Sequence, residues 1–76
     1  MTSVYSIEYQ MVIKALREAR VAGHITQEEL GKALGRPQSF IAKVENGERR
    51  LDIVEFVHLC RLVGIDPVSI INKLKY

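Results

Sequence analysis

Apolar residues recur every three or four positions between residues 6 and 22, with charged residues such as Lys14 and Arg17 between them. This spacing places the apolar side chains on one side of an α-helix and the charged side chains on the other. It predicts an amphipathic helix that ends near Gly23. The buried side of this helix is expected to consist of Tyr9, Val12, Ile13, Leu16 and Ala19.

Thr26 and Glu29 have the spacing of a capping box and predict the start of a second helix. In that motif each of the two side chains accepts a hydrogen bond from the backbone of the other residue. The signal predicts a helix over residues 27–34 that ends at Gly35, because glycine readily adopts the left-handed conformation of a helix end. The residues expected to be buried are Leu30, Ala33 and Leu34.

Three further helices follow from the same kind of signal. One spans residues 38–45, with Ile41 and Val44 facing inward and Asn46 and Gly47 at its end. The next begins after Asp52, which has Glu55 three residues later, and runs to residue 63. Its buried stripe is expected to be Ile53, Phe56, Val57, Cys60 and Val63.

The last helix is predicted over about residues 67–75, with Asp66 as its cap and Pro67 at its first position. No segment alternates with the period of two that a half-buried strand requires. The chain is therefore expected to form one all-α domain over residues 1–76, a bundle of five short helices. The short connection at Gly35 makes the second and third helices a helix-turn-helix, at about residues 26–46.

Composition limits the functions that such a chain can have. With 76 residues, of which 47% are hydrophobic, the domain leaves little room for an enclosed substrate pocket. No Ser-His-Asp set, phosphate-binding loop or pair of facing carboxylates is present. We therefore expect no enzymatic activity, no cofactor and no small-molecule substrate.

Cysteine and histidine positions exclude two other classes of site. The single cysteine, Cys60, cannot form a disulfide within the chain, which suits a reducing compartment. His24, His58 and Cys60 lack the spacing of metal ligands, so no metal site is expected. No apolar run is long enough to cross a membrane, and the first five residues do not resemble the start of a secretory signal. We expect a cytoplasmic protein with no membrane partner.

The segment from Ile25 to Gly35, followed by Ile41 and by Val44-Glu45-Asn46-Gly47, closely resembles the Cro/repressor-type helix-turn-helix family, often called XRE-like. The resemblance extends through the fourth predicted helix and covers roughly residues 10 to 66. It implies a lambda-repressor-like bundle that binds double-stranded DNA, with the second helix of the motif in the major groove.

The resemblance places four residues at the positions that contact base edges: Gln38, Ser39, Ala42 and Lys43. The amide of Gln38 offers one donor and one acceptor, which suits the N6 and N7 edge of adenine. Lys43 can reach guanine acceptors or a phosphate. The alternative for Gln38 is a solvated residue at a helix start.

Contacts to the DNA backbone are expected on both sides of the third helix. Gln27 matches a family glutamine that contacts the backbone and braces the first base-contacting residue. Five basic and two acidic residues between positions 31 and 50 give a local charge of +3, against +2 for the chain. Because phosphate neutralisation supplies most non-specific affinity, we expect backbone contacts there, with a solvated run of charges as the alternative. The expected contacts are Arg36, Asn46 with the backbone of Gly47, Arg49 and Arg50.

Arg20 and Glu45 match a family pair that forms a partly buried salt bridge between the first and third helices. Phe40 is ambiguous, since it could contact a thymine methyl group or pack against the following loop, and we favour packing.

Other positions depart from the family pattern. Gly31 replaces a usual alanine, which should weaken its helix by up to about 1 kcal/mol. His24 replaces a usual glycine, so either Gly23 or His24 must take a positive φ. Pro37 replaces a capping serine or threonine, and Leu51 replaces a usual proline.

The chain has more apolar residues near its end than a small bundle needs for its core. We expect a homodimer through this surface, since two-fold symmetric proteins bind palindromic sites. The predicted function is a sequence-specific transcriptional regulator of bacterial or phage type, most simply a homodimeric repressor that is associated with the nucleoid when bound to DNA. The alternatives are a small protein-binding adaptor, or the DNA-binding component of a toxin-antitoxin or restriction-modification operon. The expected interface residues are Val54, Val68, Ile70, Ile71, Leu74 and Tyr76.

Overall fold

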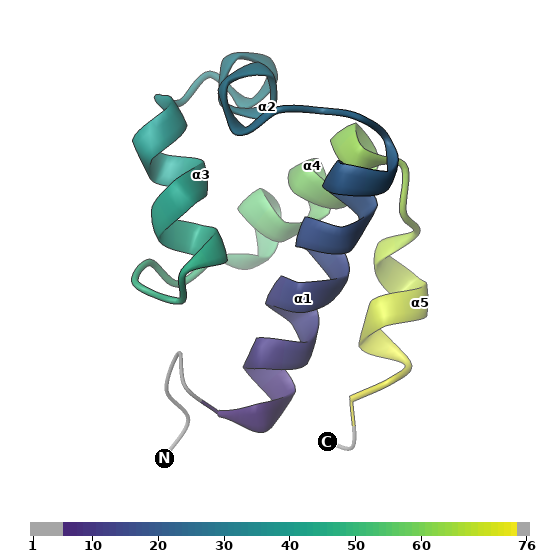
Figure 1. Cartoon of the computed structure of the whole chain (residues 1–76). Helices are drawn as coiled ribbons and strands as arrows, with labels where there is room; N and C mark the ends of the chain where they lie inside the picture. The colour runs from purple at the N-terminus through teal and green to yellow at the C-terminus, as the bar shows by residue number, and fades with distance from the viewer. Residues whose placement is uncertain (1–5, 75–76) are drawn as a thin grey trace.

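The computed structural model describes residues 6–74 and confirms the all-α architecture. The helices of this part of the chain are α1 (Ile7–Ala22), α2 (Gln27–Leu34), α3 (Gln38–Glu45), α4 (Ile53–Val63) and α5 (Pro67–Ile71) (Figure 1). Residues 6–74 contain no strand. A helix with the length and apolar character needed to cross a membrane is not found among those described.

Helix α4 is the centre of the bundle, because it packs against α1, α2 and α5. Helix α3 packs against α1 and α2, and α2 and α3 are joined by a short turn. In Figure 1, α3 lies on one side of the bundle and α5 on the other. The two helices therefore present separate surfaces. The core between the helices consists of Val12, Ile13, Leu16, Leu30, Phe40, Ile41, Val44, Phe56, Leu59, Cys60 and Ile70.

Both predicted capping boxes are present. Thr26 Oγ1 accepts the N–H of Glu29 at 3.0 Å, and Glu29 Oε1 accepts the N–H of Thr26 at 2.9 Å. This backbone hydrogen bond lowers the pKa of Glu29 below its usual value. Asp52 and Glu55 form the equivalent pair at the start of α4. These caps explain why the bounds of α2 and α4 agree with the sequence-based prediction.

Some expectations about burial and length are wrong. Ala33 is exposed, because α2 turns Leu30 and Gly31 toward the interior instead. Ile53 is 65% exposed and lines an open groove, while the core position on α4 belongs to Leu59. Helix α5 ends at Ile71, four residues before the predicted end, and Asn72 is its C-cap.

The departures at His24 and Leu51 are resolved by local geometry. His24 takes the positive φ, at 58°, while Gly23 keeps a φ of −85°. The backbone N–H of Leu51 donates a hydrogen bond to the Tyr9 hydroxyl at 2.9 Å. A proline at this position has no N–H, so leucine permits a link between α1 and the loop before α4 that proline would forbid.

Gly31 is required by a close approach of two backbone segments. A Cβ atom at this position would lie 2.7 Å from the carbonyl oxygen of Arg36 and 3.2 Å from the carbonyl carbon of Pro37. The N–H of Arg36 also donates to the Gly31 carbonyl at 2.8 Å. The lower helix propensity of glycine stays a prediction, but the structure adds a reason for this residue, because the turn between α2 and α3 packs directly on it.

We predict that Gly31→Ala lowers the free energy of unfolding by about 1 to 2 kcal/mol, because the clash is with backbone and the turn must shift. Thermal unfolding measures the effect. Ala33→Gly is the matched control, since it reports the cost of glycine at an exposed position of the same helix, about 1 kcal/mol. A higher melting temperature for Gly31→Ala would show that helix propensity outweighs the close approach.

Candidate nucleic-acid interface

Helix α3 is anchored on one side and exposed on the other. Phe40, Ile41 and Val44 are buried in the core. Gln38, Ser39 and Lys43 are exposed, and Ala42 is half-buried among them. Pro37 is the N-cap residue and makes no side-chain capping bond, so the first backbone N–H groups of α3 have no such partner. The four residues expected to contact bases thus share one face of one rigid element.

Gln38 is held in place by a second glutamine. Its Nε2 atom donates a hydrogen bond to Oε1 of Gln27 at 2.9 Å. Gln27 in turn donates from Nε2 to Oε1 of Glu45, also at 2.9 Å. Because an amide has two N–H donors and a carbonyl acceptor, Gln38 keeps one donor and its acceptor for a ligand. The bracing role expected for Gln27 has a geometric basis in these contacts.

The Arg20 and Glu45 ion pair is present and bidentate. Nε of Arg20 lies 2.7 Å from Oε2 of Glu45, and Nη2 lies 3.0 Å from Oε1. Nη1 of Arg20 also donates to the carbonyl oxygen of Ile25 at 2.8 Å. Only 13% of the arginine side chain and 8% of the glutamate side chain are exposed. The pair therefore joins α1, the connection before α2, and α3.

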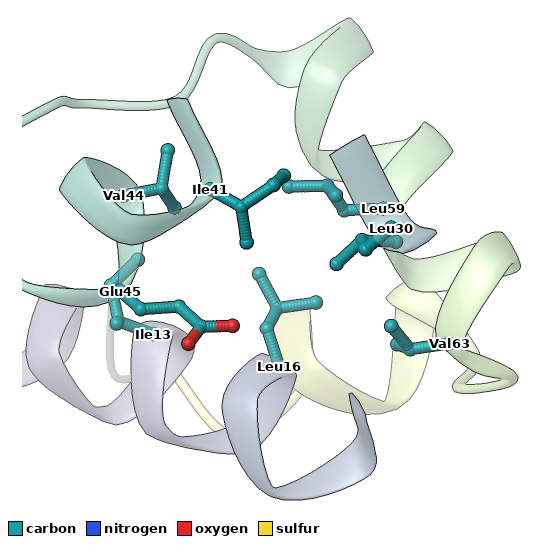
Figure 2. Close-up of a pocket in the computed structure, with 8 residues that line it drawn as sticks. All are labelled: Ile13, Leu16, Leu30, Ile41, Val44, Glu45, Leu59 and Val63. Carbon is teal, nitrogen blue, oxygen red and sulfur yellow. The ribbon is translucent and has the colours of Figure 1, made fainter. Parts of the chain in front are cut away.

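Glu45 lies at the edge of the apolar interior. Figure 2 shows its carboxylate among the side chains that line the space between the helices, including Ile13 and Leu16. That space has a volume of only about 10 Å³, roughly enough for one water molecule. It is a packed interior and not a ligand site. A charge in such surroundings needs its partners, because burial without them is costly.

A second ion cluster joins the turn before α3 and the loop after it to α4. Nη2 of Arg36 and Nη2 of Arg49 each lie 3.0 Å from Oε2 of Glu55. The two guanidinium groups also lie over the ring of Phe40, at 4.5 and 5.0 Å from its centroid. Phe40 is therefore packed and not free to contact a base. In the sequence, Glu55 is recognisable only as part of a capping box, and no local pattern indicates its arginine partners.

The loop after α3 contains the remaining basic and amide groups. Arg50 lies over the ring of Tyr9, at 4.8 Å from its centroid. Nη1 of Arg49 donates to the carbonyl oxygen of Arg50. Asn46 is the C-cap residue of α3, and Gly47 has a φ of 77°. Asn46 and Arg50 are exposed, so both are available to a ligand that lies along α3.

Only some of the residues expected at a dimer interface are exposed on the surface. Val54, Val68 and Ile71 are exposed, and Leu74 is half-buried. Ile70 is 1% exposed and belongs to the core, because α5 turns this side chain toward α4. Tyr76 lies outside the described residues. An apolar groove of about 230 Å³ adjoins these residues and is lined by Tyr9, Val12, Leu51, Asp52, Ile53, Phe56, Ile70, Ile71 and Leu74.

The cysteine of the chain lies in the core and not on the exposed face of α3. Cys60 is fully buried, and this burial raises the pKa of its thiol. Its side chain extends from α4 into the core and fills space there. Within residues 6–74 there is no group of three histidine, cysteine or acidic side chains that could hold a metal ion.

We predict that Glu45→Ala lowers the free energy of unfolding by about 3 kcal/mol, because it leaves the buried charge of Arg20 without its partner. Denaturant unfolding at neutral pH measures this loss. Glu28→Ala on exposed α2 surface is the control, with an expected change within about 0.5 kcal/mol. Equal stabilities for the two variants would mean that the ion pair contributes nothing.

Comparison with known proteins agrees with this geometry. The helix-turn-helix family matches residues 16–70, which is more than half of the chain. A similar solved structure is an XRE-family like protein from Pseudomonas syringae pv. tomato str. DC3000, with 53% identity and a TM-score of 0.81 over 87% of this chain and 80% of that chain. No curated protein sequence matches the chain. The chain belongs to the XRE-type helix-turn-helix family, a family of DNA-binding regulators.

Proposed function

We propose that this protein is a sequence-specific transcriptional repressor that binds a palindromic operator as a homodimer. Helix α3 lies in the major groove, where Gln38, Ser39, Ala42 and Lys43 contact base edges. The protein acts in the cytoplasm and is associated with the nucleoid when bound to DNA. By occupying its operator it prevents access of other proteins to the same DNA.

The observation that supports this function most directly is that the exposed side chain of Gln38 is held in one orientation by a hydrogen bond. Its side chain is exposed, yet it is fixed by Gln27, which is itself fixed by Glu45. The free N–H and the carbonyl oxygen of Gln38 are the two groups that pair with N7 and N6 of adenine. A side chain that is already oriented loses less conformational entropy on binding than a free one. Such bracing has no evident use for a merely solvated residue.

Contacts to phosphates are proposed for the groups that border the same face. Gln27 lies at the start of α2, where backbone N–H groups and the helix dipole favour an anion. Arg36, Arg49 and Arg50 lie in the turn before α3 and the loop after it, together with Asn46. These contacts hold the protein in register on the duplex and contain no sequence information of their own.

The exposed apolar surface of α4 and α5 is proposed to bind a second copy of the chain. One α3 helix spans only part of a site, so a two-fold partner doubles the bases contacted. Val54, Val68 and Ile71 are exposed on these helices, and α5 lies on the other side of the bundle from α3 (Figure 1). A dimer through them would leave both α3 faces open to DNA.

Selection of bound duplexes from a random DNA pool tests the proposed function. We expect an enriched palindrome from the wild-type protein. Gln38→Ala should relax one symmetric base position, at a cost of about 1 to 3 kcal/mol for the preferred base. Arg50→Ala is the contrasting variant, since loss of a phosphate contact weakens binding to all sequences without changing the preferred one. Retention without enrichment would contradict sequence specificity, and no retention would favour the protein-binding adaptor.

Sedimentation at micromolar concentration tests the proposed dimer. We predict that Ile71→Asp shifts the protein to a monomer, because a charge at an apolar interface loses its hydration without gaining a partner. Val21→Asp introduces the same charge at another exposed apolar position, on α1, and should leave the dimer intact. A wild-type protein that sediments as a monomer would refute this interface.

A further inference from the structure

Glu55 is a buried charged residue, and only 8% of it is exposed. Burial of a carboxylate is costly unless ion pairs and hydrogen bonds compensate it. The cap of α4 does not demand this burial, because Glu29 performs the same capping role at an exposed position of α2. The burial of Glu55 therefore indicates a second role in addition to capping α4.

The two oxygens of Glu55 have different partners. Oε1 accepts the backbone N–H of Asp52 at 3.0 Å and completes the capping box. Oε2 accepts Nη2 of both Arg36 and Arg49. In the described residues, Glu29 has a capping bond but no arginine partner. The carboxylate of Glu55 thus draws together two arginines that lie on opposite sides of α3 in the sequence.

The arginines remain available to a ligand. A guanidinium has five N–H donors in one plane, and Glu55 receives only one of these from each arginine. The side chains of Arg36 and Arg49 are 44% and 41% exposed. The ring of Phe40 lies beneath both groups and limits their rotation. Two oriented cationic groups with unused donors are suited to a phosphate.

The position of the cluster on α3 determines which phosphate it can reach. Residue 40 lies about 60° from residue 43 around the helix axis, so Phe40 borders the exposed face on the Lys43 side. Residue 45 lies only about 20° from residue 38, so Glu45 and Gln27 border the Gln38 side. A helix in the major groove has a phosphate backbone along each side. The arginine pair therefore lies along the backbone opposite to the start of α2.

We infer that Glu55 is a positioning residue for DNA binding: its buried carboxylate holds Arg36 and Arg49 together on Phe40 so that their remaining donors bind one phosphate group of the DNA backbone. This inference depends on the proposed function. Glu55 itself does not touch the DNA. It increases affinity although it is negatively charged, because the gain from two oriented arginines exceeds the repulsion from one buried carboxylate.

The test is the affinity of Glu55→Gln for a fluorescent DNA duplex pool of random sequence, measured at several salt concentrations. Glutamine keeps only one acceptor oxygen, so it cannot serve both Asp52 and the arginines. We expect binding about ten-fold weaker than wild type, since charge-assisted hydrogen bonds to phosphate are misaligned. The slope of log affinity against log salt should become shallower by about 1. Simple electrostatics predicts the opposite, because the variant loses a negative charge.

Glu29→Gln is the matched control. It removes the same charge from the equivalent position of the other capping box and retains an acceptor for Thr26, so its affinity should not fall. If Glu55→Gln is folded and binds as tightly as wild type or more tightly, the inference is wrong. If the wild-type protein does not bind the duplex pool, the proposed function itself fails.

A second pair of variants applies if Glu55→Gln does not fold. Arg49→Lys and Arg50→Lys both conserve charge, but only Arg49 is held by Glu55. A lysine has a single point of charge and cannot bind Glu55 and a phosphate through separate edges of a plane. Arg49→Lys should therefore weaken binding several-fold more than Arg50→Lys. Equal effects of the two substitutions would overturn the inference.

Discussion

The geometry of the proposed DNA-binding face depends on the hydrogen bonds of the Glu45 carboxylate. It binds Arg20 of α1 through both oxygens and accepts the amide of Gln27 of α2, while its own backbone belongs to α3. Three helices are thus fixed to one buried group. Because Gln27 also accepts a hydrogen bond from Gln38, the Glu45 carboxylate indirectly sets the orientation of the exposed Gln38 side chain. Four side chains in contact thus link the packing of the helices to the orientation of Gln38 on the proposed DNA-binding face.

Glu55 has a comparable place on the other side of α3. Its two oxygens link the start of α4 to the turn before α3 and the loop after it. The exposed face of α3 therefore lies between two buried carboxylates, one that supports an amide and one that supports two arginines. In the proposed function this arrangement would separate two tasks, since amides suit base edges and arginines suit phosphates. Helix α5, with the exposed Val68 and Ile71, lies on the other side of the bundle from α3 (Figure 1).

Local signals in the sequence predict much of this fold, but contacts between residues that are far apart in the sequence could not be predicted from it. The bounds of α2, α3 and α4 follow from capping residues and glycines that lie within a few positions of each helix end. The predicted end of α5 is too late because Leu74 continues the apolar spacing beyond Ile71, whereas the helix ends at its C-cap Asn72. The role of Gly31 depends on a turn that folds back on it, and the arginine partners of Glu55 are up to 19 residues away. Neither contact has a signature in the spacing of a single sequence. Arg20 and Glu45, which are also far apart, were paired only through the family resemblance.

If DNA binds to the braced face of α3, and not to the apolar surface of α4 and α5, the backbone amides that respond to DNA should belong to that face. The most direct measurement is a titration of the isotope-labelled protein with duplex DNA, followed residue by residue through its backbone amide NMR signals. We expect the largest changes at the start of α2, along α3 and in the loop of residues 46–52, and little change in α5. Changes concentrated on α4 and α5, with α3 unaffected, would show that DNA does not bind to α3.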